Sequence, residues 1–215
     1  MKTLTQLNED LKISRHTKVK DPTVSSFVFE VSVIHDPICV LSKLWTPFKE
    51  FRNNIFIDGE HVELDDDGYT TREYNRGEYQ IDIKGTNEIV DCEDMFFQCK
   101  YLTKVLSFNH APDMKNMRAM FKFCNNLQYV ELFDTGSVET MEETFYRCEN
   151  LKSIPKFNTE NVGNMRSMFK KCLRLETVPE LKTQNVRDFT KMFEECASLS
   201  EQTKQIWSKK YKFKK

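Results

Sequence analysis

A repeat of about 24 residues fills the second half of the chain and constrains its fold more than any other feature. In each repeat a phenylalanine is followed three residues later by a cysteine. The pairs are Phe96–Cys99, Phe121–Cys124, Phe145–Cys148, Phe169–Cys172 and Phe193–Cys196. Successive cysteines are separated by 25, 24, 24 and 24 residues. Self-similarity at a fixed period is typical of proteins that stack one structural unit on the next.

Within each repeat, the apolar residues follow the spacing of one helix face. Met165, Met168, Phe169 and Cys172 stand at i, i+3, i+4 and i+7, which is the period of an amphipathic α-helix. A residue able to cap a helix by accepting a backbone hydrogen bond precedes each block. These residues are Asp91, Asn116, Thr140, Asn164 and Asp188. The pattern predicts one short helix in every repeat.

A second apolar pattern follows each of the first four repeat cysteines and predicts a brief strand. The segments "LTKVLSFNH", "LQYVELFDT", "LKSIPKFNT" and "LETVPELKT" are short and contain β-branched residues, as strands that end in a turn do. Pro155 and Pro179 lie inside two of them, which is tolerable only where the sheet does not need their N–H. One strand and one helix per repeat predict an α/β solenoid of leucine-rich-repeat-like coils.

The repeat motif resembles that of a known family. The string Val-x-x-Met-x-x-Met-Phe-x-x-Cys-x-x-Leu, followed by a strand and Asn-Thr, is similar to the BspA-type leucine-rich repeats of bacterial surface proteins, in their methionine-rich, lipoprotein-associated variant. The likeness spans about residues 85–200. Departures from it are Cys92, Phe189, Thr144 and Leu181. The resemblance implies a protein that mediates adhesion or protein binding at a bacterial surface, either surface-attached or secreted.

The remaining segments complete a division of the chain into four parts. These are a leader or docking segment (1–24), a small β-rich N-terminal cap (25–84), the five repeats (85–199) and a helical C-terminal cap with a basic tail (200–215). Within the cap, the string Ile57-Asp58-Gly59, then Gly77-Glu78-Tyr79 leading into "IDIKG", resembles the small β-sandwich-like cap that often precedes such repeats.

Several local patterns support these end segments. Alternating apolar residues in "SFVFEVSV" and "EYQIDIKG" predict half-buried strands. The string "NNIFIDGEHVELDDDGY" predicts a hairpin that turns at Asp58-Gly59. Ser200 is expected to cap a final helix that carries Trp207.

The first 20 residues place Leu4, Leu7 and Leu11 on one helical face. They are either a frayed terminal helix or a docking peptide for a partner, and they resemble leader segments on proteins of large gut bacteriophages. Neither a signal peptide nor a membrane span is expected from the hydropathy of the chain. A cytoplasmic or virion-associated location is therefore an alternative to the bacterial surface. The net charge of −1 gives no field that favours nucleic acid.

The cysteines are expected to be buried free thiols. Zinc sites need clustered ligand pairs, whereas this period places single thiols one repeat apart, and five in a row cannot all form disulfides. No base and orienting acid accompany a thiol, because the histidines are isolated from one another. They are His16, His35, His61 and His110.

A calcium loop in "ELDDDGY" is also disfavoured. Counting from Glu63 puts Tyr74 where the bidentate Glu of an EF-hand is required. We therefore predict no catalytic residue, no metal ligand and no cofactor.

Exposed strand positions are the remaining candidate for function, because they form the usual binding face of stacked repeats. The predicted face consists of Lys104, Leu106, Tyr129, Glu131, Leu132, Lys156 and Glu180. Tyr129 with Leu132 is the expected anchor, since exposed aromatic residues mark interfaces. The alternative is that scattered exposed apolar residues carry no function.

The sequence thus predicts a non-enzymatic module that binds a protein partner. One alternative is a phage-encoded virion or accessory protein, or an intracellular scaffold, docked through its N-terminal segment. The other is a thiol enzyme or redox sensor.

Overall fold

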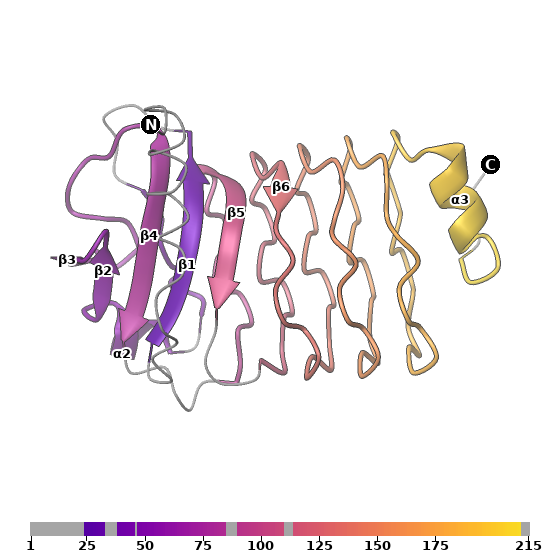
Figure 1. Ribbon diagram of the computed structural model, residues 1–215, viewed down its shortest axis with the longest axis horizontal. Helices are drawn as coiled ribbons and strands as arrows, with labels where there is room; N and C mark the ends of the chain where they lie inside the picture. Colours follow the sequence, from indigo (N-terminus) through magenta and orange to yellow (C-terminus); the bar gives the residue numbers. More distant parts are fainter. Residues whose placement is uncertain (1–23, 33–37, 46, 85–89, 110–113, 212–215) are drawn as a thin grey trace, which may run out of the picture.

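A computed structural model describes residues 24–32, 38–45, 47–84, 90–109 and 114–211. Within these residues, six strands form one mixed sheet in the order β3-β2-β4-β1-β5-β6 (Figure 1). The strands are β1 (Val24–Val31), β2 (Ile55–Ile57), β3 (Glu60–Val62), β4 (Gly77–Lys84), β5 (Leu102–Asn109) and β6 (Tyr129–Val130). The helices are α2 (Phe48–Phe51) and α3 (Glu201–Trp207).

The strands predicted before the repeats are present. β1 pairs antiparallel with β4, with Phe27 opposite Ile81, and the alternation of the two sequences places these apolar side chains on the buried face. β2 and β3 form the predicted hairpin. Its turn residues Asp58 and Gly59 have φ angles of 51° and 85°, the left-handed pair that a two-residue hairpin turn requires.

The sheet formed by the N-terminal strands continues into the repeats. β5, from the first repeat, pairs antiparallel with β1, and β6, from the second, pairs parallel with β5. Beneath the sheet, the rings of Phe27 and Phe29 contact the Phe96 ring edge-on at 5.4 and 5.1 Å between centroids. The core of the sheet and the core of the repeats are therefore continuous.

The prediction of an α/β solenoid of leucine-rich-repeat-like coils is wrong. The described part of the chain is a mixed sheet with only the short helices α2 and α3, and neither lies within the repeats. The successive repeats lie side by side along the long axis (Figure 1) as turns and irregular segments. The blocks predicted to be helical contain left-handed residues four positions apart. These are Asp94 and Gln98, Ala119 and Phe123, Glu143 and Arg147, Ser167 and Lys171, and Lys191 and Glu195.

Hydrogen bonds between repeats explain why the helical pattern does not give helices. In a helix every N–H would donate to the carbonyl four residues earlier. Here the N–H of Phe169 donates instead to Met192 O of the next repeat at 3.0 Å. The N–H of Met168 closes a tight turn on Met165 O at 3.2 Å. Alternating turns and inter-repeat bonds satisfy the backbone, and they also keep the apolar side chains on the inner face.

The predicted helix caps do accept backbone hydrogen bonds, but they begin turns. Asn164 Oδ1 accepts from the N–H of Arg166 at 2.9 Å, and Asp188 Oδ1 accepts from Thr190 at 2.7 Å. The same residues form single parallel bridges from repeat to repeat, such as that between Asn164 and Asp188. A short polar side chain is needed at this position for the turn and not for a helix.

Proline explains why the sheet ends at β6. The N–H of Glu131 donates across the repeats to Val105 O at 2.8 Å. One and two periods later the equivalent positions are Pro155 and Pro179, which have no N–H to donate. The strands predicted in the third and fourth repeats are reduced to one bridge between Ser153 and Thr177.

Columns of identical side chains fill the interior of the repeats. The rings of Phe96, Phe121, Phe145, Phe169 and Phe193 stack with centroid distances of 5.4, 5.6, 5.9 and 5.6 Å. The last ring is covered by Trp207 of α3 at 5.4 Å. Ser200 caps α3 as predicted, accepting from the N–H of Thr203 at 3.2 Å.

The predicted leader, residues 1–24, lies outside the described residues except for Val24, which begins β1. The docking role assigned to residues 1–20 therefore stays a prediction.

Candidate protein-binding surface

The residues of the predicted binding face lie on the sheet and on the repeats that follow it. Lys104 and Leu106 belong to β5, and Tyr129 belongs to β6. The parallel register sets Lys104 directly beside Tyr129. Glu131 and Leu132 follow β6 immediately, whereas Lys156 and Glu180 occupy the position of Leu132 in the next two repeats.

Tyr129 and Leu132 are the exposed apolar residues of this face. The two side chains are 40% and 56% exposed. The chain beneath them is anchored, because Val130 and Phe133 are buried at 1% and 7% exposure. Strand alternation followed by a buried phenylalanine thus presents two large side chains from a fixed backbone.

Glu131 holds the tyrosine in place. The Tyr129 hydroxyl donates to Glu131 Oε2 at 2.6 Å. Only the protonated phenol can donate this hydrogen bond, which is the main reason that the pKa of Tyr129 is raised. A side chain that is already oriented loses less conformational entropy when it binds a partner. We call Tyr129, Glu131 and Leu132 together the Tyr129 surface.

Two charged members of the predicted face, Lys104 and Glu180, form ion pairs with other residues of the chain. Lys104 Nζ lies 2.7 Å from Glu30 Oε2 on β1, and Glu180 Oε1 lies 3.4 Å from Lys210 Nζ after α3. Thr103 adds to the first pair, since its hydroxyl contacts Glu30 Oε1 at 3.1 Å. Sequence reasoning missed Glu30, because its position depends on the β1–β5 register.

This pairing gives a pH-dependent contribution to stability. The hydrogen bond from Lys104 lowers the pKa of Glu30 below its ordinary value of 4.5. A lowered carboxyl pKa stabilises the fold above the unfolded-state pKa, and this stabilisation is lost as the pH falls through the folded-state pKa.

We therefore expect Glu30→Gln to lose less stability than the unchanged protein between about pH 6 and about pH 3. The difference should be about 1 kcal/mol or less, as for other ion pairs near a surface. Denaturant titrations at both pH values measure it, and Glu180→Gln serves as a more exposed control. Equal acid sensitivity of Glu30→Gln and the unchanged protein would contradict the assignment.

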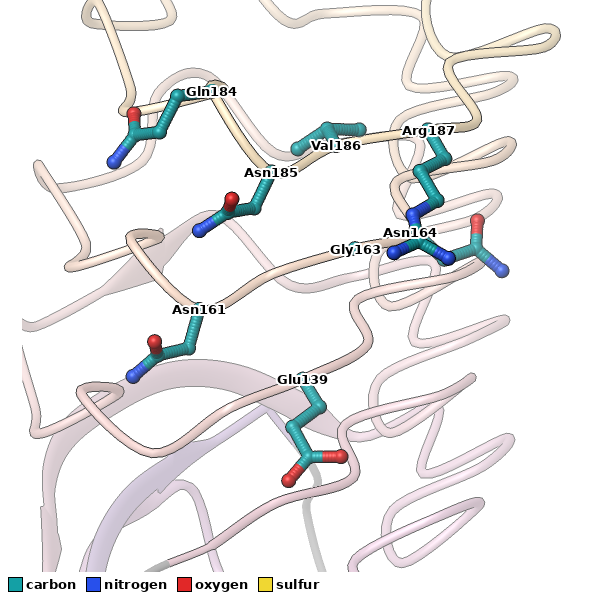
Figure 2. Close-up of a pocket in the computed structure, with 8 residues that line it drawn as sticks. All are labelled: Glu139, Asn161, Gly163, Asn164, Gln184, Asn185, Val186 and Arg187. Carbon is teal, nitrogen blue, oxygen red and sulfur yellow. The ribbon is translucent and has the colours of Figure 1, made fainter.

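A polar depression lies on the turns between the later repeats (Figure 2). It is lined by Glu139, Asn161, Gly163, Asn164, Gln184, Asn185, Val186 and Arg187. The Asn161 and Asn185 side chains point the same way (Figure 2), and each donates to a carbonyl of the preceding repeat at 2.7 Å. These amides therefore hold the repeats together. The sequence signal for them is an asparagine recurring before a valine at the repeat period, which the sequence reasoning did not use.

A known protein family matches the repeats and part of the sheet. The sequence profile of a family described as "Mycoplasma protein of unknown function, DUF285" matches residues 71–177 and, in an overlapping match, residues 115–213. Together these matches cover more than half of the 215-residue chain. The chain belongs to the DUF285 family. No curated protein and no solved structure matches it. The DUF285 match includes β4, β5, the Tyr129 surface and α3.

The thiols of this DUF285 chain are mostly enclosed. Cys92 and the five repeat cysteines are buried, whereas Cys39 is half-buried. The Sγ of Cys172 donates to Phe145 O of the preceding repeat at 3.0 Å. Burial raises the pKa of the Cys196 thiol to about 12. A thiol with a raised pKa is a poor nucleophile at neutral pH.

The aspartates of the acidic loop have charged partners or backbone contacts. Asp66 and Asp67 of the acidic loop pair with Arg52 and Lys43. Asp65 Oδ1 accepts from the N–H groups of Asp67 and Tyr69, both at 2.9 Å. Over the described ranges, no group of three or more His, Cys, Asp or Glu side chains is placed to hold a metal ion.

One further finding concerns membranes. No helix in the described part of this chain is long and apolar enough to cross a bilayer.

Proposed function

We propose that this DUF285 chain is a non-enzymatic protein-binding module and that the Tyr129 surface is its contact site. The observation that carries the proposal is a tyrosine and a leucine, 40% and 56% exposed, on a backbone anchored by buried neighbours. Tyrosine is enriched at interface positions that contribute most of the binding energy. The motif's resemblance to BspA-type surface proteins supports the same role.

The chemistry of the surface favours a protein partner. Tyr129 and Leu132 offer apolar area, and Glu131 next to them offers a carboxylate. A matching partner would place an apolar side chain over the tyrosine and leucine, with a hydrogen-bond donor near Glu131. Nucleic acid is a poorer match, because the chain carries 32 basic and 33 acidic residues and the phosphate backbone requires a basic surface.

The double substitution Tyr129→Ala/Leu132→Ala is expected to weaken binding at least about tenfold, since loss of an anchor side chain costs about 1.4 kcal/mol or more. The partner is first identified by affinity capture and mass spectrometry, then purified and titrated. The melting temperature should stay close to that of the unchanged protein, because both side chains are exposed.

Leu173→Ala is the matched control. Leu173 is 43% exposed, but it lies in the turn directly after Cys172, two repeats beyond Tyr129. It should bind the purified partner with unchanged affinity. Equal affinities for the unchanged protein, the double variant and Leu173→Ala would exclude the Tyr129 surface as the contact site.

A further inference from the structure

Cys99 differs from every other repeat cysteine in what its sulfur contacts. The Sγ atoms of later repeats donate to the phenylalanine carbonyl of the preceding repeat, as Cys124 does to Phe96 O at 3.0 Å. Cys99 belongs to the first repeat and has no earlier repeat beside it. Its Sγ lies instead 3.1 Å from Cys39 Sγ, so that a second thiol takes the place of the carbonyl.

The structure holds these two thiols in fixed positions. The backbone of Cys39 forms an antiparallel β-bridge with that of Tyr69, and the N–H of Val40 donates to Gly68 O at 3.0 Å. The same segment is tied to the first repeat, because the N–H of Ser42 donates to Met95 O at 2.8 Å. Cys39 is half-buried, whereas Cys99 is only 2% exposed. Cys39 is therefore the member of the pair that a small solute can reach, whereas Cys99 is enclosed.

We propose that Cys39 and Cys99 are a redox-active dithiol, which a low-molecular-weight disulfide such as oxidised glutathione converts into an intramolecular disulfide. The observed sulfur separation must shorten by only about 1 Å to reach a bond of about 2.05 Å. The cross-link would join the segment at residues 38–42 to the first repeat.

The reaction balances as two thiol–disulfide exchanges. The Cys39 thiol releases its proton to water, and the thiolate attacks one sulfur of the reagent. The reagent's S–S bond breaks, and its first thiolate leaves and is protonated. Cys99 then loses its proton, and its thiolate attacks the Cys39 sulfur of the mixed disulfide and expels the second reagent thiolate. Two protein thiols are oxidised, and one reagent disulfide is reduced to two thiols.

Accessibility and acidity set the order of these steps. Cys39 reacts first because it is the more exposed thiol. Cys99 is the resolving thiol, since burial and the neighbouring Cys39 sulfur raise its pKa well above the usual value. We expect the second exchange to be the slower one, because less of the Cys99 thiol is ionised at neutral pH.

The test uses the full chain treated with oxidised or reduced glutathione, then denatured, alkylated and digested. The chain has 7 cysteines, so oxidation should lower the count of free thiols from 7 to 5. Mass spectrometry should find one peptide cross-linked between Cys39 and Cys99. The oxidised protein should melt at a higher temperature, because the cross-link restricts the unfolded chain.

Two variants make the outcome decisive. Cys39→Ser should form no cross-link and show no difference in melting temperature between the two treatments. Cys148→Ser removes a buried thiol whose Sγ contacts Phe121 O at 3.1 Å, and it should still form the Cys39–Cys99 bond. A glutathione adduct that persists on Cys39, a disulfide between two chains or an unchanged thiol count would each overturn the proposal.

Discussion

Phe169→Ala is expected to lower the free energy of unfolding by about 3–5 kcal/mol, the usual cost of removing a buried aromatic ring. The Phe169 side chain is fully buried. Its ring lies between those of Phe145 and Phe193, at centroid distances of 5.9 and 5.6 Å. The substitution removes both stacking contacts and leaves a cavity. Hydrogen bonds between repeats, such as that from the N–H of Phe169 to Met192 O, fix the backbone spacing, so we expect the cavity to close only in part. Chemical denaturation measures the change.

Leu132→Ala is the control for this prediction. It also truncates an apolar side chain to alanine, but that side chain is 56% exposed. Its effect should stay within about 0.5 kcal/mol, as for most surface substitutions. If Phe169→Ala cost no more than Leu132→Ala, the column of stacked rings would not be the core that holds adjacent repeats together.

Local sequence signals predicted those features whose partners lie nearby or at a fixed period. The Asp58-Gly59 turn could be predicted because its left-handed backbone depends on the two residues themselves. Ser200 was recognisable as a cap for the same reason. The buried phenylalanine and cysteine columns followed from the period, because equivalent residues of stacked units must meet. The exposed positions of Tyr129 and Leu132 followed from the same register.

The helices and the later strands could not be predicted correctly, because non-local hydrogen bonds decide them. The Met-x-x-Met-Phe-x-x-Cys spacing fits a helix and also fits a row of four-residue turns that faces the core. Only the carbonyls of the next repeat, such as Met192 O for the N–H of Phe169, favour the turns. Likewise, Pro155 and Pro179 end the sheet because the register requires an N–H at their positions.

The same limit applies to the candidate site. Lys104 was predicted as a member of the binding face, and the structure shows that it forms an ion pair with Glu30. These residues are 74 positions apart, and only the β1–β5 register brings them together. The Cys39–Cys99 pair is equally non-local, at a separation of 60 residues. The repeat pattern identified Cys99 as core, and no pattern in the sequence indicated Cys39 as its neighbour.

Gly68→Ala is expected to destabilise the protein by about 2–5 kcal/mol. The φ angle of Gly68 is +88°, and a left-handed backbone costs a residue with a side chain about 1–2 kcal/mol. A Cβ at this position would also lie 1.8 Å from Leu41 O. That atom is backbone and cannot rotate away, so the segment must shift, which adds about 1–3 kcal/mol, as for other overpacked sites.

Gly59→Ala separates the two causes. Gly59 has nearly the same φ angle, +85°, but an added Cβ would meet nothing within 4 Å. It should therefore cost only the backbone term of about 1–2 kcal/mol. Denaturant titrations of the two variants give the difference directly. Equal destabilisation by Gly59→Ala and Gly68→Ala would show that the contact between Gly68 and Leu41 is not tightly packed.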